Sequence, residues 1–144
     1  LDEATIVTAM LHDTIEDTST TREEIAQAFN ECVALLVEAV SEVKEKEGKK
    51  LEWKERKAAY LANLETAPDD AVLIAIADKI DNVESKIEAF QIEGETLLAR
   101  WKQPSEAYLW YHGEVLRIAR MRLPDHRLTA RLAEAHAKER ETFL

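Results

Sequence analysis

The chain has 144 residues and a mass of 16.4 kDa, enough to bury a hydrophobic core without a disulfide framework, and its single cysteine, Cys32, indicates a reducing, cytoplasmic location. Hydrophobic residues make up 46% of the sequence, with only three Gly and three Pro, which excludes collagen-like and low-complexity chains and argues against a sandwich of many short strands. No apolar run reaches the roughly 18 residues of a membrane span, and the net charge of −10 repels phosphate backbones, so we expect neither a membrane nor duplex nucleic acid among the partners.

Helical patterns fill the first third of the chain. A first helix is expected to begin after Asp2, a residue type that caps helices, and to end near residues 12–13. The Thr pair at 20–21 stands three residues before the Glu pair at 23–24, which gives two overlapping capping boxes at the start of a second helix. A third apolar stripe with helical spacing follows at 33–40.

The pattern breaks at residues 44–51, which include Gly48, and this stretch is expected to be a loop. Beyond it, proline and glycine mark the ends of four further apolar stripes with helical spacing. These helices are expected at residues 53–67, 68–92, 104–118 and 124–135. The sum predicts a single all-α domain of six or seven helices over residues 1–144.

The run Leu-His-Asp-Thr-Ile-Glu-Asp-Thr at residues 11–18 places several metal-ligand types together. His12 and Asp13 stand side by side where the first helix is expected to end, and imidazole nitrogens and carboxylate oxygens both bind divalent metals. Glu16 and Asp17 follow about one helical turn later. So many acidic and ligand groups in six residues are costly unless a cation lies among them, so the run predicts a metal site.

A second run, Ala-Asp-Lys-Ile-Asp-Asn at residues 77–82, lies inside the long apolar helix. Asp78, Asn82 and Ser85 are spaced i, i+4 and i+7, so they share one helical face. Apolar residues surround Asp78 in the sequence, and a buried carboxylate needs a partner or a metal. Asp78 is therefore a candidate third ligand.

Together the two runs resemble the motifs of HD-domain metallophosphohydrolases, and within them the hydrolase domain of RelA/SpoT-like alarmone enzymes. The run at 11–18 is similar to that family's second motif nearly letter for letter, and the run at 77–82 is similar to its later Asp motif. The clear resemblance extends from about Leu1 to Phe90, and the remainder is similar to the C-terminal helices of small stand-alone HD proteins. It implies an all-α HD-type fold and hydrolysis of the 3′-diphosphate of guanosine tetraphosphate.

The resemblance also implies a cofactor and its ligands. His12, Asp13 and Asp78 would hold a divalent metal, usually manganese in this family, with magnesium and ferrous iron as alternatives. Such an ion activates water and neutralises phosphate charge.

For the remaining motif residues, the resemblance implies roles around the substrate. Glu16 and Asp17 would position or activate the attacking water. Asn82 and Ser85 would contact the nucleotide or its phosphates.

Seven of the 19 basic residues fall between Lys44 and Lys57. A local cationic patch on an acidic protein suits a small anionic ligand better than a long polyanion. We therefore expect Lys49, Lys50 and Lys57 to attract the diphosphate of a small nucleotide substrate; the alternative is a solvated, charged loop.

The sequence departs from the family pattern at its start. The family's first histidine ligand lies on a helix upstream of the stretch that begins at Leu1, so we expect that this helix is missing from the chain or that the metal site is incomplete. Residues 29–30 and 39–42 also differ from the runs common in the family, and Lys79 replaces a commoner Arg. These changes weaken the case for an alarmone more than the case for a phosphohydrolase.

Two other classes of function remain open. One is a degenerate HD domain that binds a nucleotide or a partner protein without turnover. The other is a plain helical interaction module, which leaves the paired acidic clusters unexplained; an oligomer is compatible with each class.

Two further residue types are expected to be structural. Cys32 lies in an apolar helix, which predicts a small buried side chain. The histidines at 112, 126 and 136 have no partner spacing, and we expect surface or hydrogen-bonded core positions for them.

Overall fold

A computed structural model describes residues 2–144. The regular secondary structure of the described chain is helical apart from one short hairpin, which confirms the predicted all-α fold. It divides into two compact units, one up to Ile74 and one from Ala75 onward, and each is described here by itself. The single domain expected over residues 1–144 stays a prediction. No helix among the described residues has the length and apolar character to cross a membrane.

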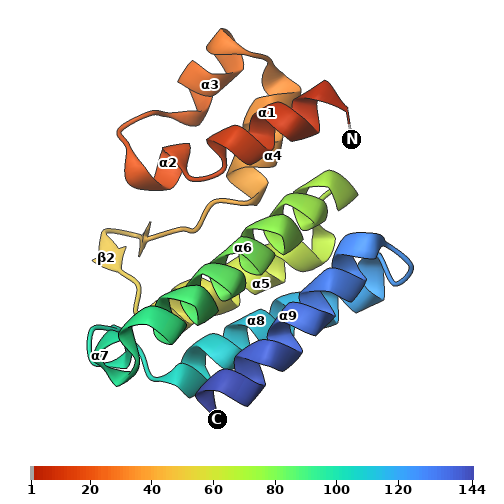
Figure 1. Ribbon diagram of the computed structural model, residues 1–144. Coiled ribbons are helices and arrows are strands. Elements are labelled where there is room, and N and C mark those ends of the chain that lie inside the picture. Colours follow the sequence, from red (N-terminus) through yellow and green to blue (C-terminus); the bar gives the residue numbers. More distant parts are fainter. Residues whose placement is uncertain (1) are drawn as a thin grey trace. The chain divides into compact units, whose positions relative to one another are not determined.

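The first unit contains small helices followed by a hairpin and a longer helix (Figure 1). In chain order these elements are α1 (Glu3–Leu11), α2 (Thr14–Asp17), α3 (Arg22–Ala28), α4 (Glu31–Ala39), β1 (Glu45–Lys46), β2 (Lys49–Lys50) and α5 (Trp53–Thr66). The expected helix boundaries hold to within a few residues. Helix α2 was not expected as a separate element.

Helix α4 is the centre of the small-helix cluster, because α1, α2 and α3 all pack on it. Its buried residues Val33, Ala34 and Val37 form a core with Ile25 of α3. They are spaced i, i+1 and i+4, so one face of α4 supplies the core. Burial of a valine or isoleucine side chain contributes about 1.5–3 kcal/mol.

Cys32 is exposed, so the expectation that it is buried is wrong. The apolar character of the surrounding sequence suggested burial. The buried face of α4 begins one residue later, at Val33, and the helical rotation of about 100° per residue takes Cys32 away from it.

Side-chain caps fix the helix ends in this unit, and two of them follow sequence expectations. The carboxylate of Asp2 accepts a hydrogen bond from the Thr5 N–H at 2.8 Å. Thr21 and Glu24 form a reciprocal capping box, with distances of 3.2 Å and 2.8 Å. Each cap of this type contributes about 0.5–2 kcal/mol.

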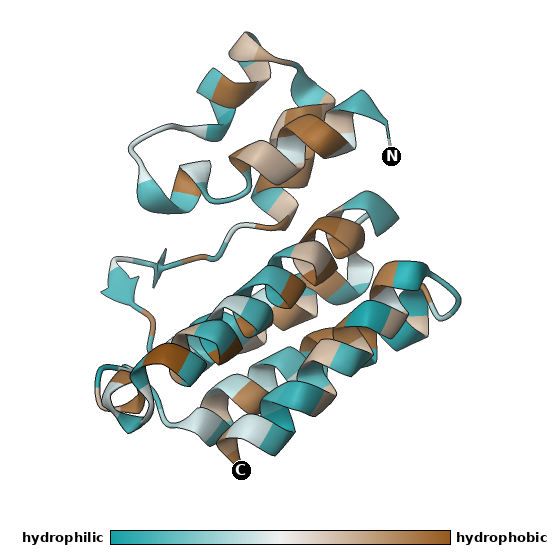
Figure 2. Cartoon of the chain, in the orientation of Figure 1, coloured by the Kyte–Doolittle hydropathy of each residue, from teal (hydrophilic) through white to brown (hydrophobic). Residues whose placement is uncertain are grey.

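The expected loop at residues 44–51 contains a two-stranded antiparallel hairpin. Glu45 pairs with Lys50 and Lys46 with Lys49. The two turn residues, Glu47 and Gly48, have φ angles of 52° and 75°, and positive φ at both positions is typical of a type I′ turn. All the hairpin residues are hydrophilic, as Figure 2 shows, so no alternation of apolar residues marked these strands in the sequence.

The second unit continues α6 (Asp69–Glu93) and adds α7 (Glu95–Leu98), α8 (Ser105–Arg122) and α9 (Arg127–Phe143). Helices α8 and α9 run antiparallel and pack on each other (Figure 1). Gly94 separates α6 from α7 with a φ of 61°, a conformation that glycine adopts without strain. The buried aliphatic residues of this unit include Val83, Val115, Ile118 and Leu132.

A buried acidic side chain links α8 and α9. Glu139 of α9 is 1% exposed, and its two carboxylate oxygens accept hydrogen bonds from Nδ1 of His112 at 2.7 Å and Nδ1 of His136 at 3.1 Å. Burial opposes ionisation of Glu139, but the two histidine hydrogen bonds outweigh it and lower its pKa from 4.5 to about 2. Burial also lowers the pKa of His112. His112 is thus the hydrogen-bonded core histidine that the sequence allowed.

We expect the second unit to lose stability in acid in two steps. Below about pH 6.5, the unfolded chain takes up a proton on His112 that the folded chain resists, because folding lowers this pKa. Between pH 4.5 and about pH 2, the unfolded chain also protonates Glu139 first. The free energy of unfolding, measured by urea titration at a series of pH values, should be highest above pH 6.5 and fall through both ranges.

Glu139→Gln should lower the free energy of unfolding at pH 7 by about 1–3 kcal/mol, because the new amide nitrogen cannot accept a hydrogen bond. It should also abolish the pH dependence between 4.5 and 2 that Glu139 contributes. Glu141→Gln, an exposed change on the same helix, is the control and should behave as wild type. Equal curves for the two variants would contradict the role given to Glu139.

Candidate functional site

His12 and Asp13 lie at the corner between α1 and α2, where the sequence placed them. His12 is the C-terminal cap residue of α1, and its Nδ1 lies 2.8 Å from the carbonyl oxygen of Ala9. Its Nε2 lies 3.1 Å from Oδ2 of Asp13. Asp13 precedes α2, but its carboxylate makes no capping hydrogen bond to that helix. The corner therefore presents an imidazole nitrogen and a carboxylate oxygen side by side.

This geometry fits two ligands of one metal ion. When Nδ1–H donates to the Ala9 carbonyl, Nε2 is the ring nitrogen that carries the lone pair, the tautomer usual for a metal-binding histidine. Bonds of about 2.1 Å that meet near a right angle place two ligand atoms about 3 Å apart. The observed 3.1 Å between Nε2 of His12 and Oδ2 of Asp13 agrees with that spacing.

The third predicted ligand, Asp78, belongs to the second unit. Among residues 2–144, no group of three His, Cys, Asp or Glu side chains is placed to hold a metal ion. His12 and Asp13, the other two residues of the predicted ligand set, lie in the first unit.

Glu16 lies on α2, one turn beyond this corner. Its Oε1 accepts a hydrogen bond from the backbone N–H of Glu42 at 2.6 Å. Burial raises the pKa of Glu16 above its ordinary value, and the nearby charges of Glu42 and Asp13 raise it further, against the Glu42 N–H and Lys44. A carboxylate with a raised pKa is a better proton acceptor near neutral pH.

Asp17 is the more exposed of the two α2 acids. Its Oδ1 lies 3.6 Å from Nζ of Lys44. The same Lys44 Nζ donates to the backbone carbonyl of Glu16 at 2.5 Å. Lys44 thus contacts both acidic residues of α2, Asp17 at its side chain and Glu16 at its backbone carbonyl.

The structure separates the three lysines of the predicted patch into two kinds. Lys49 and Lys50 lie on β2 and are exposed. Lys57 lies on α5 and forms an ion pair with Glu42, in which the two side chains are 16% and 10% exposed. Lys57 therefore has a sheltered partner rather than an open surface position. Sequence reasoning missed Glu42, because no motif spacing connects it to Glu16 or Lys57.

Asp78 and Asn82 lie on one face of α6, as the spacing predicted. Oδ1 of Asp78 accepts a hydrogen bond from Nδ2 of Asn82 at 2.7 Å. Oδ2 of Asp78 forms an ion pair with Lys79, and the Asp78 side chain is 20% exposed. Lys79 itself is nearly buried, with Nζ 5.3 Å from the ring centre of Tyr111. Asp78 thus has two polar partners on its own helix, and Ser85 lies exposed further along.

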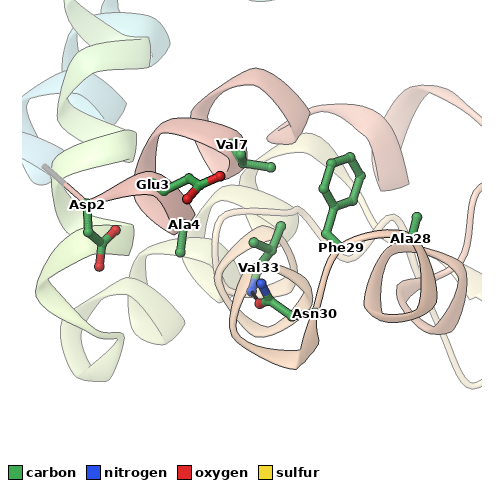
Figure 3. Close-up of a pocket in the computed structure, with 8 residues that line it drawn as sticks. All are labelled: Asp2, Glu3, Ala4, Val7, Ala28, Phe29, Asn30 and Val33. Atoms are coloured by element: carbon green, nitrogen blue, oxygen red, sulfur yellow. Dashed lines mark hydrogen bonds between the residues drawn. The ribbon is translucent and has the colours of Figure 1, made fainter.

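A hollow of about 540 Å³ opens in the first unit, between α1 and the start of α4 (Figure 3). Asp2 and Glu3 line it on the α1 side, and Phe29 and Asn30 line it on the other. None of the predicted site residues lies in its wall. Its carboxylates repel phosphate, so this hollow does not suit a nucleotide diphosphate.

Three comparisons with known proteins bear on this arrangement. The family model described as HD domain matches residues 1–101. The chain is 42% identical over 88 residues to guanosine-3′,5′-bis(diphosphate) 3′-pyrophosphohydrolase of Aquifex aeolicus, a match that covers 59% of this chain and 12% of the relative. It is 37% identical over 82 residues to guanosine-3′,5′-bis(diphosphate) 3′-pyrophosphohydrolase MESH1 of Drosophila melanogaster, which covers 57% and 43% respectively. The chain thus spans less than half the length of either relative.

Among solved structures, the chain is similar to the crystal structure of lmo0812 from Listeria monocytogenes EGD-e, with a TM-score of 0.84 and 27% identity. That match covers 96% of this chain and 88% of the other. Because the HD domain model matches 101 of the 144 residues, including the His12–Asp13 corner and Asp78, the chain belongs to the HD domain family.

Proposed function

We propose that this protein is a metal-dependent phosphohydrolase that removes the 3′-diphosphate of guanosine 3′,5′-bis(diphosphate). The observation that carries the proposal is the His12–Asp13 corner, where Nε2 and Oδ2 lie 3.1 Å apart while Ala9 holds Nδ1. The names of the Aquifex and Drosophila relatives, both guanosine-3′,5′-bis(diphosphate) 3′-pyrophosphohydrolases, support this substrate. The test is release of pyrophosphate from guanosine 3′,5′-bis(diphosphate) by the natural protein with Mn²⁺.

The proposed metal is a divalent ion, with manganese as the first choice. His12 and Asp13 would hold it through the corner described above, and Asp78 enters as a third ligand through its motif. When bound, such an ion lowers the pKa of water and neutralises phosphate charge. For Asp78 to bind the metal, its carboxylate must release its contact with Lys79 or with Asn82.

Glu16 is proposed as the proton acceptor. The oxygen of a water molecule attacks the phosphorus next to the 3′ oxygen, and the bond between that phosphorus and the 3′ oxygen breaks. Glu16 takes a proton from the attacking water and later releases it to solvent, while the departing 3′ oxygen takes a proton from solvent, which gives GDP and pyrophosphate. The raised pKa of Glu16 and its fixed hydrogen bond to Glu42 support this role, with Asp17 as the second acid of the turn.

Lys49 and Lys50 are proposed to attract the diphosphate, because they are exposed cations on a protein of net charge −10. Asn82 and Ser85 are proposed to contact the nucleotide from α6, and Asn82 would then give up its contact with Asp78. We place the protein in the cytoplasm, where such nucleotides and reduced thiols such as that of Cys32 are found.

One observation favours a second candidate, an HD domain that binds a nucleotide without turnover. Both carboxylate oxygens of Asp78 are engaged by Lys79 and Asn82. A site in which these contacts persist has lost a metal ligand. Metal titration separates the two candidates, because only the hydrolase requires Asp78 to bind metal.

Asp13→Asn and Asp78→Asn should each weaken Mn²⁺ binding at least about tenfold and should abolish hydrolysis. Tenfold is the lower limit because mutation of a residue that merely supports a ligand already costs about that much in metal affinity. Isothermal titration calorimetry with Mn²⁺ measures the first effect. Asp81→Asn, an exposed change on the same helix as Asp78, is the matched control and should bind metal normally. Wild-type affinity in Asp78→Asn would remove Asp78 from the ligand set.

Glu16→Gln should keep metal binding and lower kcat by about 10²–10⁴-fold, the usual contribution of a general base. The amide oxygen can still accept the Glu42 N–H, so the fold should persist. Steady-state kinetics and Mn²⁺ titration together check this result. An unchanged kcat in Glu16→Gln would transfer the role to another group, and Asp17→Asn is the next variant to measure.

Lys49→Glu with Lys50→Glu should raise KM for the diphosphate substrate while leaving the thermal midpoint nearly unchanged, because both residues are exposed. The increase should shrink as salt rises, since exposed charges are screened beyond roughly 8 Å at physiological ionic strength. Lys102→Glu with Lys138→Glu makes the same change of charge at exposed positions of the second unit and is the control. Equal KM values at low salt for the two double variants would contradict a local attraction.

A further inference from the structure

Glu42 connects the candidate proton acceptor to a helix far along the chain. Its backbone N–H donates to Oε1 of Glu16 at 2.6 Å, while its side chain forms an ion pair with Nζ of Lys57. The first contact involves α2 and the second involves α5. Glu42 itself lies between α4 and β1, in a segment without regular structure.

The ion pair is sheltered from water. The side chains of Lys57 and Glu42 are only 16% and 10% exposed, so solvent screens their attraction less than it screens a surface pair. Nζ of Lys57 also lies 5.8 Å from the ring centre of Trp53. A reciprocal capping box between Glu52 and Glu55 fixes the start of α5, which limits the movement of Lys57.

Helix α2 cannot hold Glu16 in place by itself. It has four residues, a length at which a helix in water has no stability of its own. Its Ile15 packs on the α4 core, and Lys44 donates to the Glu16 carbonyl at 2.5 Å. These contacts hold the backbone of the turn, whereas the Glu42 N–H holds the carboxylate itself.

We infer that the Glu42–Lys57 ion pair positions the Glu16 carboxylate for proton transfer, by holding the Glu42 N–H against it. This inference rests on the proposed hydrolase function. We propose no contact between the substrate and Glu42 or Lys57, so both are positioning residues. The arrangement explains why a lysine that the sequence assigned to substrate attraction has a sheltered partner instead.

Loss of the pair should therefore act on kcat. An error of about 1 Å in the position of a catalytic group costs about 10²-fold in rate. Lys57→Met should lower kcat at least about tenfold with little change in KM or in Mn²⁺ affinity, since the variant leaves the metal corner and the exposed lysines intact. Lys57→Arg keeps the positive charge and should retain most of the wild-type kcat.

The test combines kinetics with a signal that does not depend on turnover. In nitrogen–proton correlation spectra of the natural protein, the Glu42 amide reports its hydrogen bond to Glu16 through its proton shift and its exchange rate. Lys57→Met should move this signal and speed its exchange, and Lys57→Arg should not. Lys46→Met, which removes an exposed charge from β1, is the control and should leave the signal and kcat unchanged. Glu42→Met, which removes the side-chain acceptor of the pair while keeping the backbone N–H, replaces Lys57→Met if that variant does not fold, and should change both readouts in the same direction.

The outcomes separate this inference from the proposed function. An active wild type whose Lys57→Met variant keeps its kcat, or loses it without any change in the Glu42 signal, overturns the positioning role alone. A loss in Lys57→Arg as large as that in Lys57→Met also overturns it. A wild type that binds Mn²⁺ but releases no pyrophosphate overturns the proposed function, and the catalytic part of this inference with it. A coupled change in kcat and in the Glu42 signal, with retention in Lys57→Arg, supports it.

Discussion

The packing of Leu11 and Ile15 on the buried face of α4 is the constraint on which the candidate site depends. Leu11 directly precedes the corner that carries His12 and Asp13, and Ile15 follows it. Because an apolar contact before the corner and another after it are both fixed, the chain has little freedom to turn the two polar side chains elsewhere. The hydrophobic energy of the small-helix core is thereby used to bring a nitrogen and a carboxylate oxygen within 3.1 Å of each other.

Polar contacts then fix the orientation of His12 and Glu16, whose backbone positions the apolar core sets. The Ala9 carbonyl selects which ring nitrogen of His12 faces Asp13. The Glu42 N–H and Lys44 hold the carboxylate and the carbonyl of Glu16. Each of these partners is a backbone group or a long side chain supplied by a neighbouring segment. The site is thus assembled from a short motif and from supports that lie 3 to 28 residues away in the sequence.

Sequence patterns predicted those features whose physical cause is local. The capping box of Thr21 and Glu24 and the single-face spacing of Asp78 and Asn82 depend only on helix geometry, and both were found as expected. Glu42 was not found, because its two partners are 26 and 15 residues away and no periodic pattern relates such positions. The same limit explains Lys57, whose charge was visible but whose sheltered partner was not. The exposure of Cys32 was missed because an apolar segment does not reveal which of its faces is buried.

The buried carboxylate of Glu139 limits how far α8 and α9 can slide along each other. Leucine, valine and isoleucine contacts between α8 and α9 would tolerate a shift of one helix along the other, because one apolar side chain can replace another. A slip of one turn, about 5.4 Å, would however remove Glu139 from His112 and leave an ionised group in an apolar interface. His136 lies on α9 with Glu139, so its hydrogen bond would persist, but it would not replace the one lost from His112. The buried charge therefore favours a single longitudinal register between α8 and α9, the one in which Glu139 contacts His112.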